Sequence, residues 1–227
     1  MAESEAMFVG HLAVALGARR AEPRAPLAAL IGAAFGLDLL WPILLFAGVE
    51  TVRIDPGNTA FTPLAFDHYP WSHSLSMAVI LGVAAGRIAA PILRSARAGL
   101  FVGLAVFSHW VLDYVTHRPD LPLYPGGPLV GLGLWNSVPG SLLVEGALFL
   151  AAIEYYRRGA RARDAQGRWS FWSLIGLTTV IWVSGPWAPP PPSAMAVAGV
   201  ALAMWLFPVW GSWIDRHRTR PRSAFDN

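Results

Sequence analysis

The segment AGLFVGLAVFSHWVLDYVTH, residues 98–117, decides the class of this protein. It contains no Lys or Arg, and it is long enough to cross the hydrocarbon core of a bilayer as a helix. Two polar side chains, His109 and Asp113, lie inside it, four residues apart. We therefore predict a transmembrane helix that carries a polar site.

The composition of the whole chain agrees with this prediction. Of the 227 residues, 55% are hydrophobic and only 14% are charged, whereas about 25% are charged in a typical soluble domain. Disordered chains are poor in apolar residues, so the composition excludes disorder and argues strongly against a water-soluble enzyme. The absence of cysteine excludes disulfides, cysteine-bound zinc and a thiol nucleophile.

Further apolar runs flank the segment 98–117 and extend the predicted bundle. We predict an all-α fold, a polytopic helical membrane bundle of six or seven spans, without strands. The count depends on the first run, because its 13 residues are short for a span and could form a tilted or re-entrant helix. Pro42 is expected to kink the second run. The further runs are 6–18, 25–49, 73–93, 138–156, 171–187 and 194–214.

The whole chain, 1–227, is predicted to be a single integral membrane domain. Its motif-bearing part is 10–145, a C-terminal helical pair covers 171–214, and a cytoplasmic tail covers 215–227. Pairs of glycines four residues apart occur in three of the runs, and we expect them to allow close helix packing inside the protein. These pairs are Gly32 and Gly36, Gly82 and Gly86, and Gly99 and Gly103.

The arginines indicate the orientation in the membrane. All 17 basic residues are arginine. All but Arg53, Arg87 and Arg118 gather in short clusters, which lie in alternate connections between the runs and after the last run. Such clusters argue against a nucleic-acid partner, and arginine-rich connections stay in the cytoplasm. We therefore predict a multi-pass membrane protein with a cytoplasmic C-terminus. Residues 157–170 are expected inside, and 50–72, 117–137 and 188–193 outside. The lipid bilayer is the predicted partner, and the oligomeric state stays open.

Ionisable residues inside the runs are the strongest functional signal. Each costs at least about 2.5–3.5 kcal/mol at the centre of a membrane helix, so such residues usually face the bundle interior and find partners. With the predicted orientation, the histidines and aspartates converge on the outer half of the bundle, and Glu145 lies at a similar depth. His109 and Asp113 share one helix face because they are four residues apart. They could form a simple buried hydrogen bond or two ligands of a divalent metal ion.

We favour a metal site, because more histidines and carboxylates are expected at the same depth. Zinc is the preferred ion, and more ligands are available than one tetrahedral zinc needs. The site could therefore hold two ions, or one ion with outer partners that orient its ligands. The segment 117–137 is either a lid over this site or a set of simple turns. The predicted metal ligands are His11, Asp38, His73, His109 and Asp113. The predicted catalytic residues, as general base or outer partner, are His68 and Glu145.

The order of these residues resembles a known family, the bacterial membrane-bound predicted metal-dependent hydrolases. This resemblance implies that the membrane is the bacterial inner membrane. The resemblance rests on Gly10-His11, Leu37-Asp38, His68 with His73-Ser74, and Ser108-His109 with Asp113. The segments HRPDLPLYPGGP and GLGLWNS resemble a subgroup of the same proteins. The pattern is also distantly similar to the zinc-dependent phospholipase C and single-strand nuclease superfamily, which implies phosphoester hydrolysis.

Together these observations predict a membrane-embedded, metal-dependent hydrolase. Its substrate would be a phosphoester of a lipid or a lipid-linked compound at the outer face of the membrane. Two alternatives remain open from the sequence. The same residues could line a transport pathway, or they could form buried His–Asp pairs that only hold the bundle together.

Overall fold

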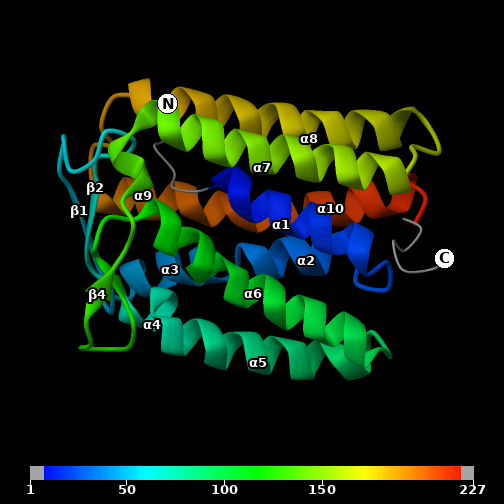
Figure 1. The fold of residues 1–227 in the computed structure, drawn as a ribbon, viewed down its shortest axis with the longest axis horizontal. Coiled ribbons are helices and arrows are strands. Elements are labelled where there is room, and N and C mark those ends of the chain that lie inside the picture. Colours follow the sequence, from blue (N-terminus) through cyan, green and yellow to red (C-terminus); the bar gives the residue numbers. More distant parts are fainter. Residues whose placement is uncertain (1–7, 221–227) are drawn as a thin grey trace.

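The computed structural model describes residues 8–220. The first residues of the 6–18 run and the last seven residues of the predicted tail lie outside this range. The fold is mostly helical, as predicted, and its helices lie roughly side by side along the longest axis of the molecule (Figure 1). The α-helices are α1 (Phe8–Ala21), α2 (Leu27–Ala34), α3 (Gly36–Phe46), α4 (Pro70–His73), α5 (Leu75–Ile92), α6 (Ala96–Thr116), α7 (Val138–Gly159), α8 (Ala165–Ser184), α9 (Ala194–Ala201) and α10 (Leu206–His217).

Short polar side chains define where most of the long helices begin. Helices α5 to α9 each start after a Ser or Asp whose side-chain oxygen accepts a hydrogen bond from a backbone N–H of the first turn. This satisfies one of the amide groups that have no partner within the helix. The capping residues are Ser74, Ser95, Ser137, Asp164 and Ser193.

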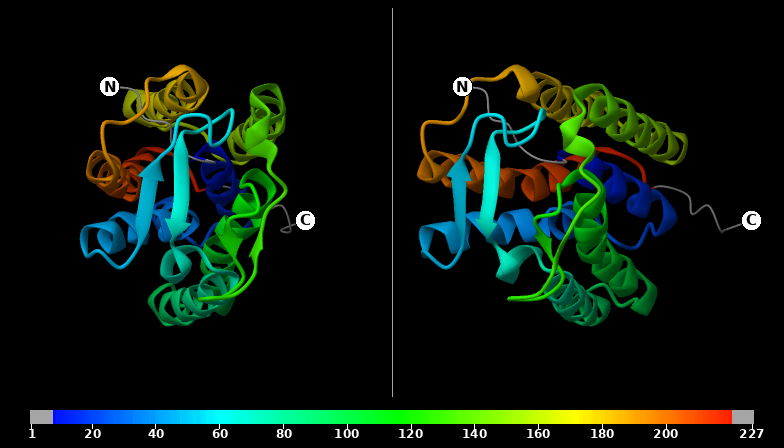
Figure 2. Two further views of the ribbon diagram at one scale, coloured as in Figure 1. Left: turned by 90° about the vertical axis from the view of Figure 1, so that its left-hand side faces the viewer. Right: turned by 60° about the vertical axis from the view of Figure 1, so that its left-hand side comes forward.

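Two small antiparallel hairpins correct the prediction that strands would be absent. Strand β1 (Thr51–Ile54) pairs with β2 (Leu64–His68), and β3 (Leu121–Pro122) pairs with β4 (Leu129–Val130). The connections that contain them are long, and strand pairing supplies hydrogen bonds for their backbone groups. Both hairpins lie at one end of the helices, which we call the hairpin end (Figure 2). Short 3₁₀ helices are η1 (Leu134–Asn136), η2 (Gly185–Trp187) and η3 (Leu202–Trp205).

The arginine-rich connections all lie at the opposite end, which we call the arginine end (Figure 1). The turns between α1 and α2, α5 and α6, and α7 and α8 meet there, together with the end of α10. Only Arg53 and Arg118 belong to the hairpins and loops of the other end. The fold therefore gathers into one end the charges that the sequence places in separate connections.

Within the described range, four helical segments are long and apolar enough to cross a membrane, or five if the bent pair α2–α3 is one span. These segments are α5, α6, α7, and the stretch Ala194–His217 that joins α9 to α10. The 14-residue α1 and the 20-residue α8 are not among them. Several apolar helices of this kind are typical of a membrane protein, whereas six or seven spans stay a prediction.

The bend between α2 and α3 is important for the site. The chain bends by 53° between the two helices, at Phe35. Pro42, where a kink was expected, lies inside α3. The break leaves the carbonyl of Ala34 at the end of α2, and it places Asp38 in the first turn of α3. Helix N-termini attract carboxylates because their backbone N–H groups carry partial positive charge.

Candidate metal centre

Helix α6 supplies the fixed part of the site. His109 and Asp113 lie on its buried side, with 0% and 2% of their surfaces exposed. Nε2 of His109 lies 3.2 Å from Oδ2 of Asp113. The predicted shared face therefore exists, and it points into the protein, where α6 packs against α1 and α2.

Asp38 and His73 approach this pair from two other elements. Nε2 of His73, the last residue of α4, lies 3.3 Å from Oδ1 of Asp38 and 3.3 Å from Nε2 of His109. The Nε2 atom of His109 is 3.5 Å from the same Asp38 oxygen. These three residues therefore bring ligand atoms close enough to share one metal ion.

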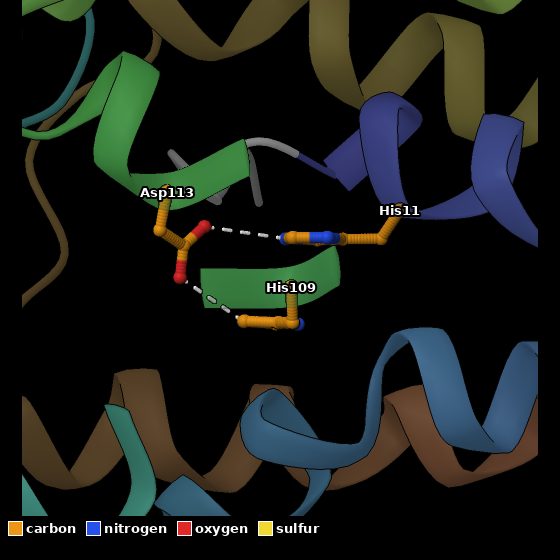
Figure 3. A group of neighbouring side chains, drawn as sticks. All are labelled: His11, His109 and Asp113. Carbon is orange, nitrogen blue, oxygen red and sulfur yellow. Dashed lines mark ion pairs between the residues drawn. The ribbon is translucent and has the colours of Figure 1, made fainter. Parts of the chain in front are cut away.

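His11 from α1 completes a second, overlapping group with His109 and Asp113. Its Nε2 atom lies 3.4 Å from Oδ1 of Asp113 and 3.9 Å from Oδ2 of Asp38. The His11 ring stacks on the His109 ring, with centroids 3.8 Å apart and planes 3° apart. In Figure 3 the two rings lie one above the other, and the Asp113 carboxylate faces both.

The structure thus brings together all five side chains that the sequence predicts as metal ligands. All of them are buried except Asp38, whose side chain is 18% exposed. A buried His–Asp cluster of this kind could hold a metal ion.

In two of these histidines, His109 and His73, Nδ1 is hydrogen-bonded to another group of the protein. His109 Nδ1 lies 2.8 Å from the carbonyl oxygen of Ala34. A carbonyl only accepts hydrogen bonds, so Nδ1 must carry the proton. The free lone pair of neutral His109 is then on Nε2, the atom that faces the cluster.

His73 is oriented by a longer chain of hydrogen bonds. The Ser72 hydroxyl lies 2.6 Å from an oxygen of the buried Glu50 carboxylate and 2.6 Å from Nδ1 of His73. Because the hydroxyl donates its only hydrogen to Glu50, it must accept from His73 Nδ1–H. Glu50 also accepts the backbone N–H groups of Trp71 and Ser72 at 2.8 Å. Outer partners of this type commonly orient metal-binding histidines.

Sequence reasoning identified neither Glu50 nor the orienting role of Ser72. Glu50 lies in the connection after α3, where a single carboxylate gives no spacing signal. His11 differs from the other two histidines, since its Nδ1 atom has no hydrogen-bond partner within residues 8–220.

Neither of the two predicted catalytic residues belongs to the groups of candidate metal ligands in the described chain. His68 is exposed at the end of β2. Glu145 is fully buried on α7. The indole groups of Trp135 and Trp182 approach its carboxyl group, but no described residue gives either oxygen a hydrogen bond of standard geometry. A catalytic role for His68 or Glu145 stays a prediction.

A small pocket opens onto the cluster. Asp38, His73 and Asp113 form its polar wall, together with His117. Its volume of about 30 Å³ is enough for a water molecule or two. The remaining wall is apolar and consists of Trp41, Leu64, Phe66, Val197, Ala201 and Met204.

No family model, no curated protein and no solved structure matches this chain. The chemistry of the site must therefore be argued from its own residues.

Proposed function

We propose that this protein is a membrane-embedded, metal-dependent hydrolase that cleaves a phosphoester of a lipid or lipid-linked substrate. One observation supports the metal most directly. The outer hydrogen bonds of His73 and His109 direct the Nε2 atoms of both rings toward two carboxylates. When both Nε2 atoms are unprotonated, these acceptors repel one another, and a metal cation bound between them would remove that repulsion.

Zinc is the ion we propose, since imidazole nitrogens and carboxylate oxygens are ligands that it commonly takes. Asp38, His73, His109 and Asp113 would hold it, and His11 would serve a second ion or complete the first. A divalent ion there would polarise a phosphoryl oxygen and activate water as the nucleophile. The protein residues around it keep the ligands in place. Glu50 and Ser72 orient His73, and the Ala34 carbonyl orients His109.

The apolar wall of the pocket favours an amphiphilic substrate. Val197, Ala201 and Met204 come from α9 and η3, which belong to one of the candidate spans. A substrate could present its phosphate to the polar wall and keep its hydrocarbon part beside these side chains. The substrate class itself rests on the resemblance to metal-dependent membrane hydrolases and, more distantly, to zinc-dependent phospholipases.

We further propose six spans, or seven if α1 also inserts, with the hairpin end outside the inner membrane. Helix α8 would be the additional span, because it packs against α10, which ends another candidate span. The gathering of arginines at one end supports this orientation, since arginine-rich ends stay in the cytoplasm.

The first test is metal content. Protein purified in detergent and supplied with zinc, manganese and iron should retain a divalent ion, measured by elemental analysis. Asp113→Asn should lose most of it, because the variant removes a charged ligand shared by both groups. Asp67→Asn is the matched control, since its exposed carboxylate pairs with Arg53 instead. Wild-type protein that stays metal-free would overturn the proposal.

The second test is turnover. Metal-loaded protein is assayed with a phosphodiester, a phosphomonoester and a lipid-linked pyrophosphate. Hydrolysis that disappears in Asp113→Asn and persists in Asp67→Asn supports the proposal. The alternative is a non-catalytic bundle or a transporter, in which the His109–Asp113 contact of 3.2 Å is a plain ion pair. Metal-free wild-type protein without turnover would favour the bundle, and metal-loaded protein without turnover would favour transport.

A further inference from the structure

A second His–Asp pair borders the same pocket, because His117 is one of its lining residues. His117 caps the C-terminus of α6, one turn beyond Asp113, and is 2% exposed. Its Nδ1 atom lies 2.9 Å from Oδ1 of Asp120. The Trp135 and Phe66 rings pack against the imidazole, with centroids 4.4 and 4.9 Å away.

Asp120 is held as a hydrogen-bond acceptor on both of its oxygens. The Tyr69 hydroxyl donates to Oδ1 at 3.3 Å, and the Arg118 Nε–H donates to Oδ2 at 3.1 Å. His117 Nδ1 lies closer to this carboxylate, at 2.9 Å, than to the Tyr69 hydroxyl, at 3.3 Å, and the carboxylate keeps the proton on Nδ1. The other ring nitrogen, Nε2, has no hydrogen-bond partner in the described chain and is therefore the atom that can exchange a proton.

His117 lines the pocket that Asp38, His73 and Asp113 also line. Because residues four apart on a helix have Cβ atoms about 5–6 Å apart along one face, His117 is one step further toward the hairpin end than Asp113. A phosphoryl group bound beside these residues would lie between the His–Asp cluster and the imidazole, and it needs more room than the pocket of about 30 Å³ gives in this structure. In an in-line displacement the attacking and leaving oxygens lie on opposite sides of phosphorus.

We propose that His117 is a catalytic residue that donates a proton from Nε2 to the leaving oxygen. This inference rests on the proposed hydrolase function. Water attacks phosphorus from the cluster side and forms the new phosphorus–oxygen bond. The bond to the leaving oxygen breaks, and that oxygen takes the Nε2 proton and departs as an alcohol. The proton lost by the water passes to solvent, from which Nε2 is protonated again.

The decisive experiment varies the leaving group. An alkyl alcohol needs a proton as it departs, whereas 4-nitrophenol does not. His117→Gln should slow hydrolysis of an alkyl phosphodiester by about 10²–10⁴-fold, the usual contribution of a general acid. It should slow the matching 4-nitrophenyl phosphodiester much less. His217→Gln is the control, because His217 also pairs with an aspartate, Asp164, but is the last residue of α10, at the arginine end. Equal losses with both substrates, or no loss with either, would overturn the role.

Two further measurements do not depend on turnover. The metal content of His117→Gln should equal that of the wild type, and a large loss would make His117 a ligand instead. The Nε2 nitrogen resonance of His117, identified by its absence in His117→Gln, should shift when inorganic phosphate is added to metal-loaded protein. An unmoved resonance would contradict the contact with phosphate. If the wild type cleaves no phosphoester while the resonance shifts, the proposed function fails, and the phosphate contact of His117 is supported.

Discussion

At the scale of single residues, the site depends on side chains that fix the ligands. A histidine binds a metal only through an unprotonated nitrogen, so the proton must be kept on the other one. The Ala34 carbonyl does this for His109, and the Ser72–Glu50 pair does it for His73. These contacts within the folded chain fix the direction in which the Nε2 atoms of His109 and His73 point.

Loss of the Glu50 charge should weaken metal binding without removing a ligand. In Glu50→Gln, the side-chain amide no longer requires Ser72 to donate, and His73 can rotate or change tautomer. We expect metal affinity to fall about 10–100-fold, the usual range for an outer partner. Competition with a chelator measures it. Glu154→Gln, at an exposed carboxylate on α7, should leave the affinity unchanged. Equal affinities in Glu50→Gln and the wild type would contradict this account.

At the scale of secondary-structure elements, the backbone of α6, which carries His109 and Asp113, approaches that of α5 closely. A Cβ atom added at Gly103 would lie 2.6 Å from the carbonyl oxygen of Gly82, and one added at Gly86 would lie 2.9 Å from that of Gly99. The predicted packing role of these two glycine pairs is therefore confirmed. The close approach positions α6, and with it His109 and Asp113.

Gly103→Ala should destabilise the protein even though alanine favours helices. The new methyl group would push α5 away from α6, and overpacking of this kind typically costs about 1–3 kcal/mol. Gly176→Ala is the matched control, because a Cβ atom at Gly176 on α8 meets open space and alanine gains about 1 kcal/mol of helix propensity. Thermal unfolding in detergent compares the two. Equal stability of both variants would contradict the close packing.

At the scale of the whole molecule, the arrangement of charges supports the proposed orientation. The arginine end carries the α1–α2, α5–α6 and α7–α8 connections (Figure 1). The pocket beside the cluster is lined in part by Leu64 and Phe66 of β2, a strand of the hairpin end. If the arginine end faces the cytoplasm, water and substrate reach the site from outside.

Single cysteines can test this orientation directly, since the chain has none of its own. Ala60 in the β1–β2 loop and Ala165 at the start of α8 are both exposed. We expect a membrane-impermeant thiol reagent to label Ala60→Cys on intact cells. Ala165→Cys should react only after the cells are opened. The reverse pattern would invert the topology and place the pocket on the cytoplasmic side.

The sequence alone determined the class of the protein and the five residues of the cluster. Long apolar runs and the cost of ionisable groups within them are properties of local composition. They can be recognised without knowing how the segments pack. His11, Asp38, His73, His109 and Asp113 were therefore identified before the fold was known.

Only the tertiary structure decided what surrounds these residues. Glu50 reaches Ser72 across 22 positions of the chain, and Ala34 reaches His109 across 75. Such contacts depend on a bend at Phe35 and on the paths of connecting loops, neither of which has a periodic pattern. The same reason explains why His68, predicted as catalytic, lies exposed on β2, while His117 faces the pocket. Local sequence selects the chemical groups, and contacts between distant segments decide which of them meet.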